Sequence, residues 1–151
     1  MEIRVDNLQN PAVVALLNAH LLDMAEHSPP ESVHALDLKA LRAPEITFWT
    51  AWQTDQLMGC GALQETSPGE GEIKSMRTSS EHLRKGIAAS ILERLIAEAR
   101  LRNYSRVNLE TGSAEVFRAA RLLYERYGFE YCEPFGNYNK DPHSLFMQLK
   151  L

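Results

Sequence analysis

The sequence predicts an α/β fold in which helices flank a sheet with both parallel and antiparallel strand pairs. Apolar residues recur at helical spacing over residues 85–101, which predicts a long amphipathic helix. Residues 46–52 are rich in β-branched and aromatic side chains, and a second apolar run at 57–63 follows a polar turn at 54–56, which indicates two adjacent strands. The complete predicted order is β, α, α, β, β, β, α, β, α, β, β. Strands joined by short turns pair antiparallel, whereas a helix between two strands permits parallel pairing.

The N-terminal part is predicted to form one strand and two helices. Residues 3–5 alternate between apolar and polar, as in a short strand. Pro11 opens a helical pattern, because proline suits the first turn of a helix, and the pattern ends at 28–31 with two prolines. A second, short helix is expected from Val33 to Leu41, with Ser32 as its candidate N-cap.

The middle of the chain is predicted to form three consecutive strands. The strands at 46–52 and 57–63 are followed by a loop at 67–71 and by a third strand at 72–78. Trp49 and Trp52 lie three positions apart in the first of these strands, so their side chains face opposite sides of the sheet. One of them is expected in the core, and the other is expected to be exposed or close to a pocket.

The C-terminal part is predicted to alternate helices and strands. The helix at 85–101 is followed by a short strand at 107–110 and by a helix at 117–127, which Gly128 ends as a C′ glycine. Two further strands, 129–135 and 144–149, are expected on either side of a polar loop.

Length and composition indicate one domain over residues 1–151. Sixteen Lys and Arg against twenty Asp and Glu give a net charge of −4, which argues against a nucleic-acid partner and against a polybasic membrane anchor. The N-terminus lacks the apolar segment of a signal peptide, and no apolar run has the length of a membrane span. Cys60 and Cys132 fit a reduced, cytoplasmic setting and show no metal-ligand spacing. Monomer and homodimer both remain open.

The most informative stretch is the loop that connects the predicted strand 72–78 with the helix that follows it. The first N–H groups of a helix have no intrahelical partner, and together with the helix dipole they favour an anion such as a pyrophosphate. Gly86 allows close approach of the backbone, and Arg84 and Lys85 add positive charge. Neither the P-loop pattern nor the dinucleotide fingerprint is present. The stretch therefore predicts an anion site of another kind.

Two motifs resemble signatures of the GNAT superfamily of N-acetyltransferases. The segment 83–88, Leu-Arg-Lys-Gly-Ile-Ala, resembles the acetyl-CoA loop Q/R-x-x-G-x-G/A, and 120–129 is similar to the second signature A-x-x-L-Y-x-x-x-G-F. The segments 28–34, 74–78, 109–113 and 141–144 resemble a bacterial subfamily sometimes labelled IAA acetyltransferase. The resemblance implies a mixed, mostly antiparallel GNAT sheet, acetyl-CoA as co-substrate, no metal, and direct transfer of the acetyl group to a small-molecule amine in a ternary complex.

The resemblance also implies roles for individual residues. Glu72 is the candidate general base, with a solvated glutamate at a strand start as the equally weighted alternative. Tyr124 is the candidate general acid toward the departing CoA thiolate, although helical spacing alone would place it in the core. His34, His82 and His143 are expected at the surface or in caps rather than in catalysis. The residues implied in cofactor binding are Met76, Arg77, Thr78, Leu83, Arg84, Lys85, Gly86, Ile87 and Ala88, and those implied in acceptor binding are Ser28, Glu31, His34, Phe135 and Tyr138.

Two positions depart from the family pattern. Leu83 occupies the first loop position, where Gln or Arg is usual, so Arg84 is the candidate to replace that phosphate contact. Phe117 stands where Asn often contacts the cofactor. Two other function classes stay open: a protein or peptide N-acetyltransferase, for which a long open groove would argue, and a non-catalytic acyl-CoA sensor.

Overall fold

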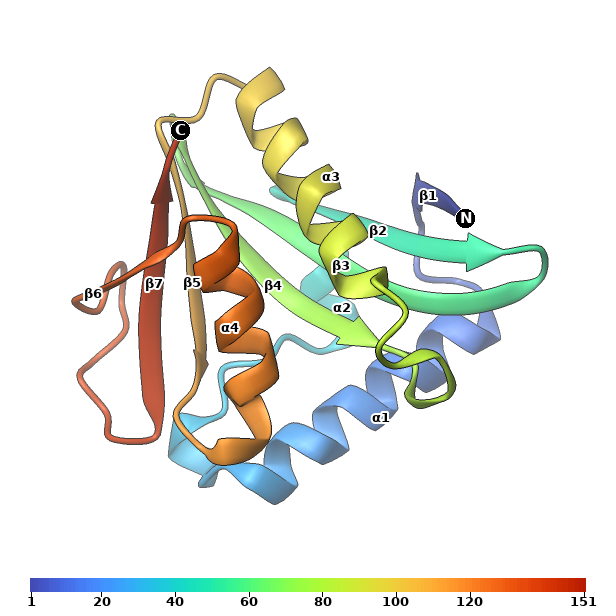
Figure 1. Ribbon diagram of the computed structural model, residues 1–151, viewed down its shortest axis with the longest axis horizontal. Helices are drawn as coiled ribbons and strands as arrows, with labels where there is room; N and C mark the ends of the chain where they lie inside the picture. Colours follow the sequence, from blue (N-terminus) through green and yellow to red (C-terminus); the bar gives the residue numbers. More distant parts are fainter.

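The computed structural model describes residues 1–151 and has a seven-stranded mixed sheet flanked by helices, as predicted (Figure 1). The strand order is β1-β2-β3-β4-β5-β7-β6. Short 3-10 turns lie at Pro30–Ser32, Ser80–His82 and Glu115–Phe117. The elements are β1 (Glu2–Val5), α1 (Pro11–His27), α2 (Leu38–Leu41), β2 (Ile46–Gln53), β3 (Gln56–Ser67), β4 (Glu70–Thr78), α3 (Ile87–Leu101), β5 (Arg106–Gly112), α4 (Arg118–Arg126), β6 (Glu130–Cys132) and β7 (Ser144–Lys150).

The sheet has a single parallel pair, and this pair is short. All neighbouring strands run antiparallel except β4 and β5, which α3 connects. The β4–β5 pairing starts at Glu70–Arg106 and ends at Ile73–Leu109. Beyond that point β4 continues to Thr78 and β5 to Gly112 without pairing with each other. The sheet therefore opens in its middle, between two strands that remain bound to their outer neighbours.

Helices cover both faces of the sheet and form a separate apolar core on each. Figure 1 shows α3 and α4 together on the near face, with α2 behind the sheet. One core packs α3 and Tyr124 of α4 against the sheet, and the other packs α1 and α2 against β2 and β3. Trp49 belongs to the first core and Trp52 to the second, so the prediction of opposite faces is confirmed. The expectation that one of them is exposed is wrong, because both faces are covered and the two residues are 1% and 5% exposed.

The predicted second helix is the largest error in the sequence-based assignment. Residues 33–37 are not helical, and α2 begins only after Asp37, whose carboxylate accepts a hydrogen bond from the backbone N–H of Ala40 at 2.8 Å. Ser32 lies in a 3-10 turn and does not cap a helix, because its hydroxyl donates instead to the carboxylate of Asp141. A contact far along the chain therefore overrides the local capping signal.

Smaller shifts occur at three element ends. The third strand of the middle group begins at Glu70 and not at residue 72. The long helix begins at Ile87, because Arg84 and Gly86 adopt positive φ angles of 62° and 77°, which are incompatible with a helix. The strand predicted at 129–135 is reduced to β6, which ends before Pro134, a residue without a backbone N–H for strand pairing.

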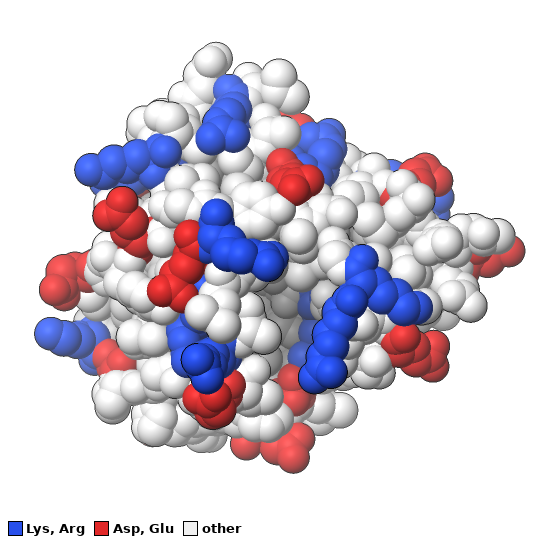
Figure 2. Space-filling model, viewed as in Figure 1, with Lys and Arg blue, Asp and Glu red and all other residues white.

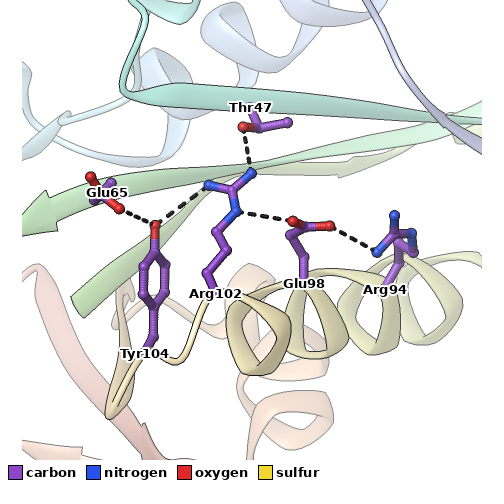
Figure 3. A network of polar contacts seen from close by, with 6 residues as sticks. All are labelled: Thr47, Glu65, Arg94, Glu98, Arg102 and Tyr104. Carbon is purple, nitrogen blue, oxygen red and sulfur yellow. Dashed lines mark hydrogen bonds and ion pairs between the residues drawn. The ribbon is translucent and has the colours of Figure 1, made fainter. Parts of the chain in front are cut away.

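Arg102 ties the C-terminal end of α3 to the sheet (Figure 3). Its guanidinium donates to Glu98 at 3.0 Å, to the hydroxyl of Thr47 on β2 at 2.8 Å and to the hydroxyl of Tyr104 at 3.4 Å. The Tyr104 hydroxyl in turn donates to Glu65 on β3 at 2.9 Å. These bonds fix the position of α3 along the sheet, and with it the position of the N-terminus of α3 beside the end of β4.

We expect Arg102→Ala to lower the free energy of unfolding by about 1–2 kcal/mol, because it removes three hydrogen bonds at a partly exposed site. Arg100→Ala is the matched control, since Arg100 has the same charge and lies in the last turn of α3, two residues before Arg102, but is exposed. Urea unfolding of both variants measures the difference. Equal losses in the two variants would contradict a role of the network in holding α3.

Candidate active site

A cavity of about 130 Å³ lies where β4 and β5 part. Elements from both faces of the sheet line it: α1, the segment 28–35, both strands, and α4. Glu72 of β4 and Tyr124 of α4, which are far apart in the sequence, both lie on its wall. The opening in the sheet thus brings the two candidate catalytic residues to one space, which we term the inner cavity.

Glu72 is buried and held by two donors. Its side chain is 7% exposed, and its Oε2 accepts a hydrogen bond from the Tyr138 hydroxyl at 2.6 Å and from Lys74 Nζ at 3.1 Å. Lys74 also donates to the Tyr138 hydroxyl at 2.8 Å. The Oε1 atom has no partner within the protein. Glu72 is therefore not a solvated residue at a strand start, and one carboxylate oxygen stays free to accept a proton.

Tyr138 joins an aromatic cluster next to Glu72. Its ring packs edge-on against His34 at 5.0 Å and against Phe135 at 5.3 Å between ring centroids, and Phe146 of β7 lies 5.5 Å away. Burial and the negative charge of Glu72 raise the pKa of the Tyr138 hydroxyl far above its usual value, so it stays protonated and donates. Three residues of the predicted acceptor site, His34, Phe135 and Tyr138, therefore come together in the structure.

A larger hollow of about 1060 Å³, the outer trough, lies beside the inner cavity. It is lined by the ends of β3 and β4 and by the loop 135–143, and the hydrogen bond between Ser32 and Asp141 joins two of its walls. His34, Glu72 and Lys74 line both spaces. Of the other predicted acceptor residues, Ser28 lines the inner cavity and Glu31 only the outer trough.

Tyr124 is buried with a free hydroxyl. It is 7% exposed, its ring packs 5.7 Å from that of Phe129, and its hydroxyl makes no hydrogen bond within the protein. Burial raises the pKa of this hydroxyl to about 12, so it carries its proton at neutral pH. The residue therefore belongs to the core and also presents a proton donor to the inner cavity.

The loop between β4 and α3 leaves the N-terminus of α3 uncapped. Gly86 occupies the N-cap position with no side-chain cap, and the N–H groups of residues 87–89 have no partner. A Cβ at Gly86 would meet nothing within 4 Å, so open space lies directly before these donors. Figure 2 shows Lys and Arg side chains on both sides of a hollow between this loop and α4. The arrangement is typical of a site for a phosphate group.

The other residues of the predicted cofactor site differ in their surroundings. Leu83 is 58% exposed and Ile87 is buried in the core beneath α3. Arg77 is engaged by Asp23 of α1 at 2.5 Å, so its charge is already paired. His82, expected at the surface, is buried, and its ring nitrogen lies 3.1 Å from Lys85 Nζ. The residues in the stretch from Met76 to Thr78 lie on β4 past the last β4–β5 pair.

The comparison with known proteins decides the family. Residues 13–129 match the sequence pattern of the acetyltransferase (GNAT) family. The chain belongs to this family. It is 57% identical over its whole length to the uncharacterized N-acetyltransferase YsnE of Bacillus subtilis, with all of both chains covered. It is 39% identical to an IAA acetyltransferase of Azospirillum brasilense, over 93% of this chain and 91% of that protein.

Solved structures of GNAT proteins have the same fold. A Klebsiella pneumoniae protein assigned as an acyl-CoA N-acyltransferase is 29% identical, with a TM-score of 0.81 over 99% of this chain and 97% of that one. A GNAT acetyltransferase of Elizabethkingia anophelis, with acetyl-CoA bound, has a TM-score of 0.70 at 18% identity over 99% and 97% of the two chains. The prediction of a GNAT acetyltransferase is therefore confirmed. None of the helices combines the length and the apolar character that a membrane span requires.

The Phe117 departure from the GNAT pattern has a structural basis. Phe117 packs directly over Gly112 at the end of β5, where a Cβ would lie 2.2 Å from the ring. Arg121 of α4 donates to the carbonyl of Gly112 at 2.9 Å and holds the helix there. Phe117 therefore contributes an apolar wall to the inner cavity in place of an amide contact.

Five polar residues of the inner cavity were missed by the sequence analysis. They are His20, Lys74, Ser75, Glu110 and Thr111. A signal existed for Glu110, because it directly follows the alternating strand segment Val107–Leu109 and so lies toward the carboxyl end of a parallel strand, where ligands commonly bind. His20 carries no such signal, since a histidine on a helix face is common in solvent and in cores.

Glu110 is a carboxyl group of the inner cavity whose pKa is raised by burial. It is the first β5 residue beyond the last β4–β5 pair, and burial raises its pKa to about 7 from the usual 4.5, against the opposing effect of Lys74. Glu72 and Asp141 add to the rise through their negative charges.

We expect Glu110→Gln to stabilise the protein at pH 8 and much less at pH 5. Between pH 4.5 and about 7 the folded state holds this proton more tightly than the unfolded state, so the free energy of unfolding falls as pH rises through that window. At pH 8 the substitution removes the cost of burying a charged carboxylate. After allowance for partial exposure, the free energy of unfolding should rise by about 1–2 kcal/mol, and the melting temperature by roughly 2–8 °C. Thermal melts at both pH values test this. The control is Glu115→Gln, whose side chain is 82% exposed, and a pH-independent gain for Glu110→Gln would contradict the assignment.

Proposed function

We propose that this GNAT protein transfers the acetyl group of acetyl-CoA to the amine of a small molecule, directly and within a ternary complex. The observation that carries the proposal is the inner cavity, because it opens at the parted strands and has Glu72 and Tyr124 on its wall. Its volume of about 130 Å³ suits a small acceptor group and the acetyl group. A carboxylate and a protonated phenol are the acid–base pair that transfer of an acetyl group from a thioester to an amine requires.

The cofactor site we propose extends from the α3 N-terminus to the gap in the sheet. The unpaired N–H groups before Gly86 and in the first turn of α3, with Arg84 and Lys85, would hold the pyrophosphate. The backbone groups of Met76, Arg77 and Thr78, which lie past the last β4–β5 pair, would pair with the pantetheine arm. The thioester would then lie beside Tyr124, and a backbone N–H of β4 would polarise its carbonyl.

The two candidate catalytic residues would act in sequence. A protonated amine cannot attack a thioester, so the free Oε1 of Glu72 would take the amine proton, directly or through a water. The amine nitrogen then forms a bond to the acetyl carbon as the carbon–sulfur bond breaks. Tyr124 would give its hydroxyl proton to the departing sulfur, which is consistent with a hydroxyl that has no other partner.

The outer trough favours a second candidate, an acceptor that is a peptide or protein. Its volume of about 1060 Å³ exceeds what a small amine needs, and it connects with the inner cavity at Glu72 and Lys74. Assays that detect released CoA thiol, with a panel of small amines and a panel of peptides, distinguish the two acceptors. Binding of acetyl-CoA without turnover in either panel would indicate a sensor.

We expect acetyl-CoA to raise the melting temperature of the protein. Ligand at about 100 times its dissociation constant should add about 2.7 kcal/mol to the free energy of unfolding. Gly86→Asp should abolish the shift, because it places a negative charge in the open space before the α3 N-terminus. Gly69→Asp is the control, since Gly69 also has a positive φ and open space around it but lies in the β3–β4 turn. A full shift in Gly86→Asp would contradict the loop assignment.

We expect Tyr124→Phe to lower kcat by about 10²–10⁴-fold with little change in acetyl-CoA affinity, because the hydroxyl acts only as the thiolate leaves. The melting temperature should barely change, since the hydroxyl makes no hydrogen bond and the ring is retained. Glu72→Gln should differ in its pH–rate profile: its loss should shrink as pH rises, because more of the acceptor is then already deprotonated. Full kcat in Tyr124→Phe would mean that Tyr124 serves the core alone.

A further inference from the structure

Two residues on the wall of the inner cavity each have a buried polar atom with no partner in the protein. These atoms are Nδ1 of His20 on α1 and Oγ of Ser75 on β4. His20 is 7% exposed and Ser75 is 9% exposed, so neither is satisfied by bulk solvent. Buried polar groups are almost always hydrogen-bonded, because desolvation without a partner is costly. Two orphaned groups on one small cavity therefore indicate that a ligand supplies their partner.

The backbone at Ser75 is held in an unusual conformation that keeps this residue at the cavity. Strand β3 pairs Cys60 with Arg77 and Ala62 with Lys74, which leaves a bulge at Ser75 and Met76. Ser75 has a φ of 56°, in the left-handed region that costs a non-glycine residue free energy, and its carbonyl accepts from the Cys60 thiol at 3.3 Å. Such strain persists where the surrounding structure enforces it, and it is frequent at ligand sites.

The surroundings of His20 favour an oxygen over a cation as the ligand atom. Burial and the positive charge of Arg77 lower the pKa of His20 to about 4, so the ring is neutral at physiological pH and offers one N–H donor. Asp23, the other charged group near it, is already paired with Arg77 at 2.5 Å. An imidazole N–H and a serine O–H are both able to donate to one oxygen. The carboxylate near His20 is already paired, so it offers no free negative charge that would favour an ammonium group there.

We propose that His20 and Ser75 bind an oxygen atom of the acceptor, so that the acceptor is an amine with a carboxylate, carbonyl or hydroxyl oxygen close to its nitrogen. This inference rests on the proposed transfer to a small amine and narrows its substrate class. The cavity then has two kinds of contact: the carboxylates of Glu72 and Glu110 for the amine, and the donors of His20 and Ser75 for the oxygen. An alkylamine without the oxygen would leave both donors unpaired.

The test uses sets of four amines that share one side chain: an amino acid, its amide, the amino alcohol, and the alkylamine that lacks the oxygen. One set is leucine, leucinamide, leucinol and isoamylamine, and further sets carry small, aromatic and acidic side chains. Release of CoA thiol from acetyl-CoA gives kcat/KM for each. We expect at least one oxygen-bearing member of a set to exceed its alkylamine by about ten- to a hundredfold. Comparison of the amino acid, the amide and the amino alcohol identifies whether a carboxylate, carbonyl or hydroxyl oxygen is bound.

Variants of His20 and Ser75 test whether these two residues cause the preference for oxygen-bearing amines. Ser75→Gly and Ser75→Ala both remove the hydroxyl. Glycine adopts the positive φ of this position without strain, so Ser75→Gly tests the hydroxyl even if Ser75→Ala does not fold. His20→Phe removes both ring nitrogens and keeps a planar ring. Each should lower kcat/KM for the preferred acceptor about tenfold more than kcat/KM for its alkylamine. Ser105→Ala, far from the cavity at the start of β5, and Leu22→Ala, 74% exposed on α1, are the matched controls.

The outcomes separate this inference from the proposed function. The inference is overturned if the protein acetylates amines with no preference for those that carry the oxygen. It is also overturned if the variants lose the same factor in kcat/KM for an oxygen-bearing amine and for its alkylamine. Both results leave the proposed function standing. A rise in the acetyl-CoA dissociation constant of the Ser75 variants without loss of acceptor preference also overturns it, because the hydroxyl would then bind the cofactor. No transfer to any amine, with acetyl-CoA still bound, overturns the inference together with the proposed function.

Discussion

The separation of β4 from β5 is the constraint on which the rest of the site depends. The two strands pair only from Glu70–Arg106 to Ile73–Leu109, and each then continues without a partner on the inner side. Unpaired strand edges are costly in a protein interior, so the fold needs elements that fill the gap from both faces. Helices α1 and α4 do so, and the space left between them is the inner cavity. Gly112 permits this closure, because any larger residue would collide with Phe117.

Charge in the site is arranged around buried carboxylates. Glu72 is buried with Lys74 and Tyr138 as donors, which compensates its charge, whereas Glu110 lies at the same gap with a pKa raised by burial. The two carboxylates therefore differ in their surroundings although they lie on adjacent strands. Such a difference between neighbouring acids is common where proton transfer takes place. It also explains why the loop 135–143 matters, since Tyr138 reaches Glu72 from that loop.

Family membership and acceptor identity are decided by different parts of the molecule. The family match and the fold shared with solved GNAT structures rest on the chain as a whole. The inner cavity and the outer trough, where we propose that the acceptor binds, are lined in part by α1, the segment 28–35 and the loop 135–143. A fold hosts many activities because such segments vary while the scaffold stays. For this reason our proposal for the acceptor rests on His20 and Ser75 and not on overall similarity.

The sequence by itself determined the order of the elements and placed Glu72 on a strand and Tyr124 on a helix, because each depends on local periodicity or on a short motif. It also predicted an anion site in the loop before α3. It failed at residues 33–37, where Ser32 is bound by Asp141 and does not cap a helix. Only the tertiary structure decided that Glu72 is buried against Tyr138, that Lys74 and Glu110 face the same space, and that His20 and Ser75 are left without partners. The physical reason is that burial and hydrogen bonding at these residues depend on segments far apart in the chain, which a local pattern does not encode.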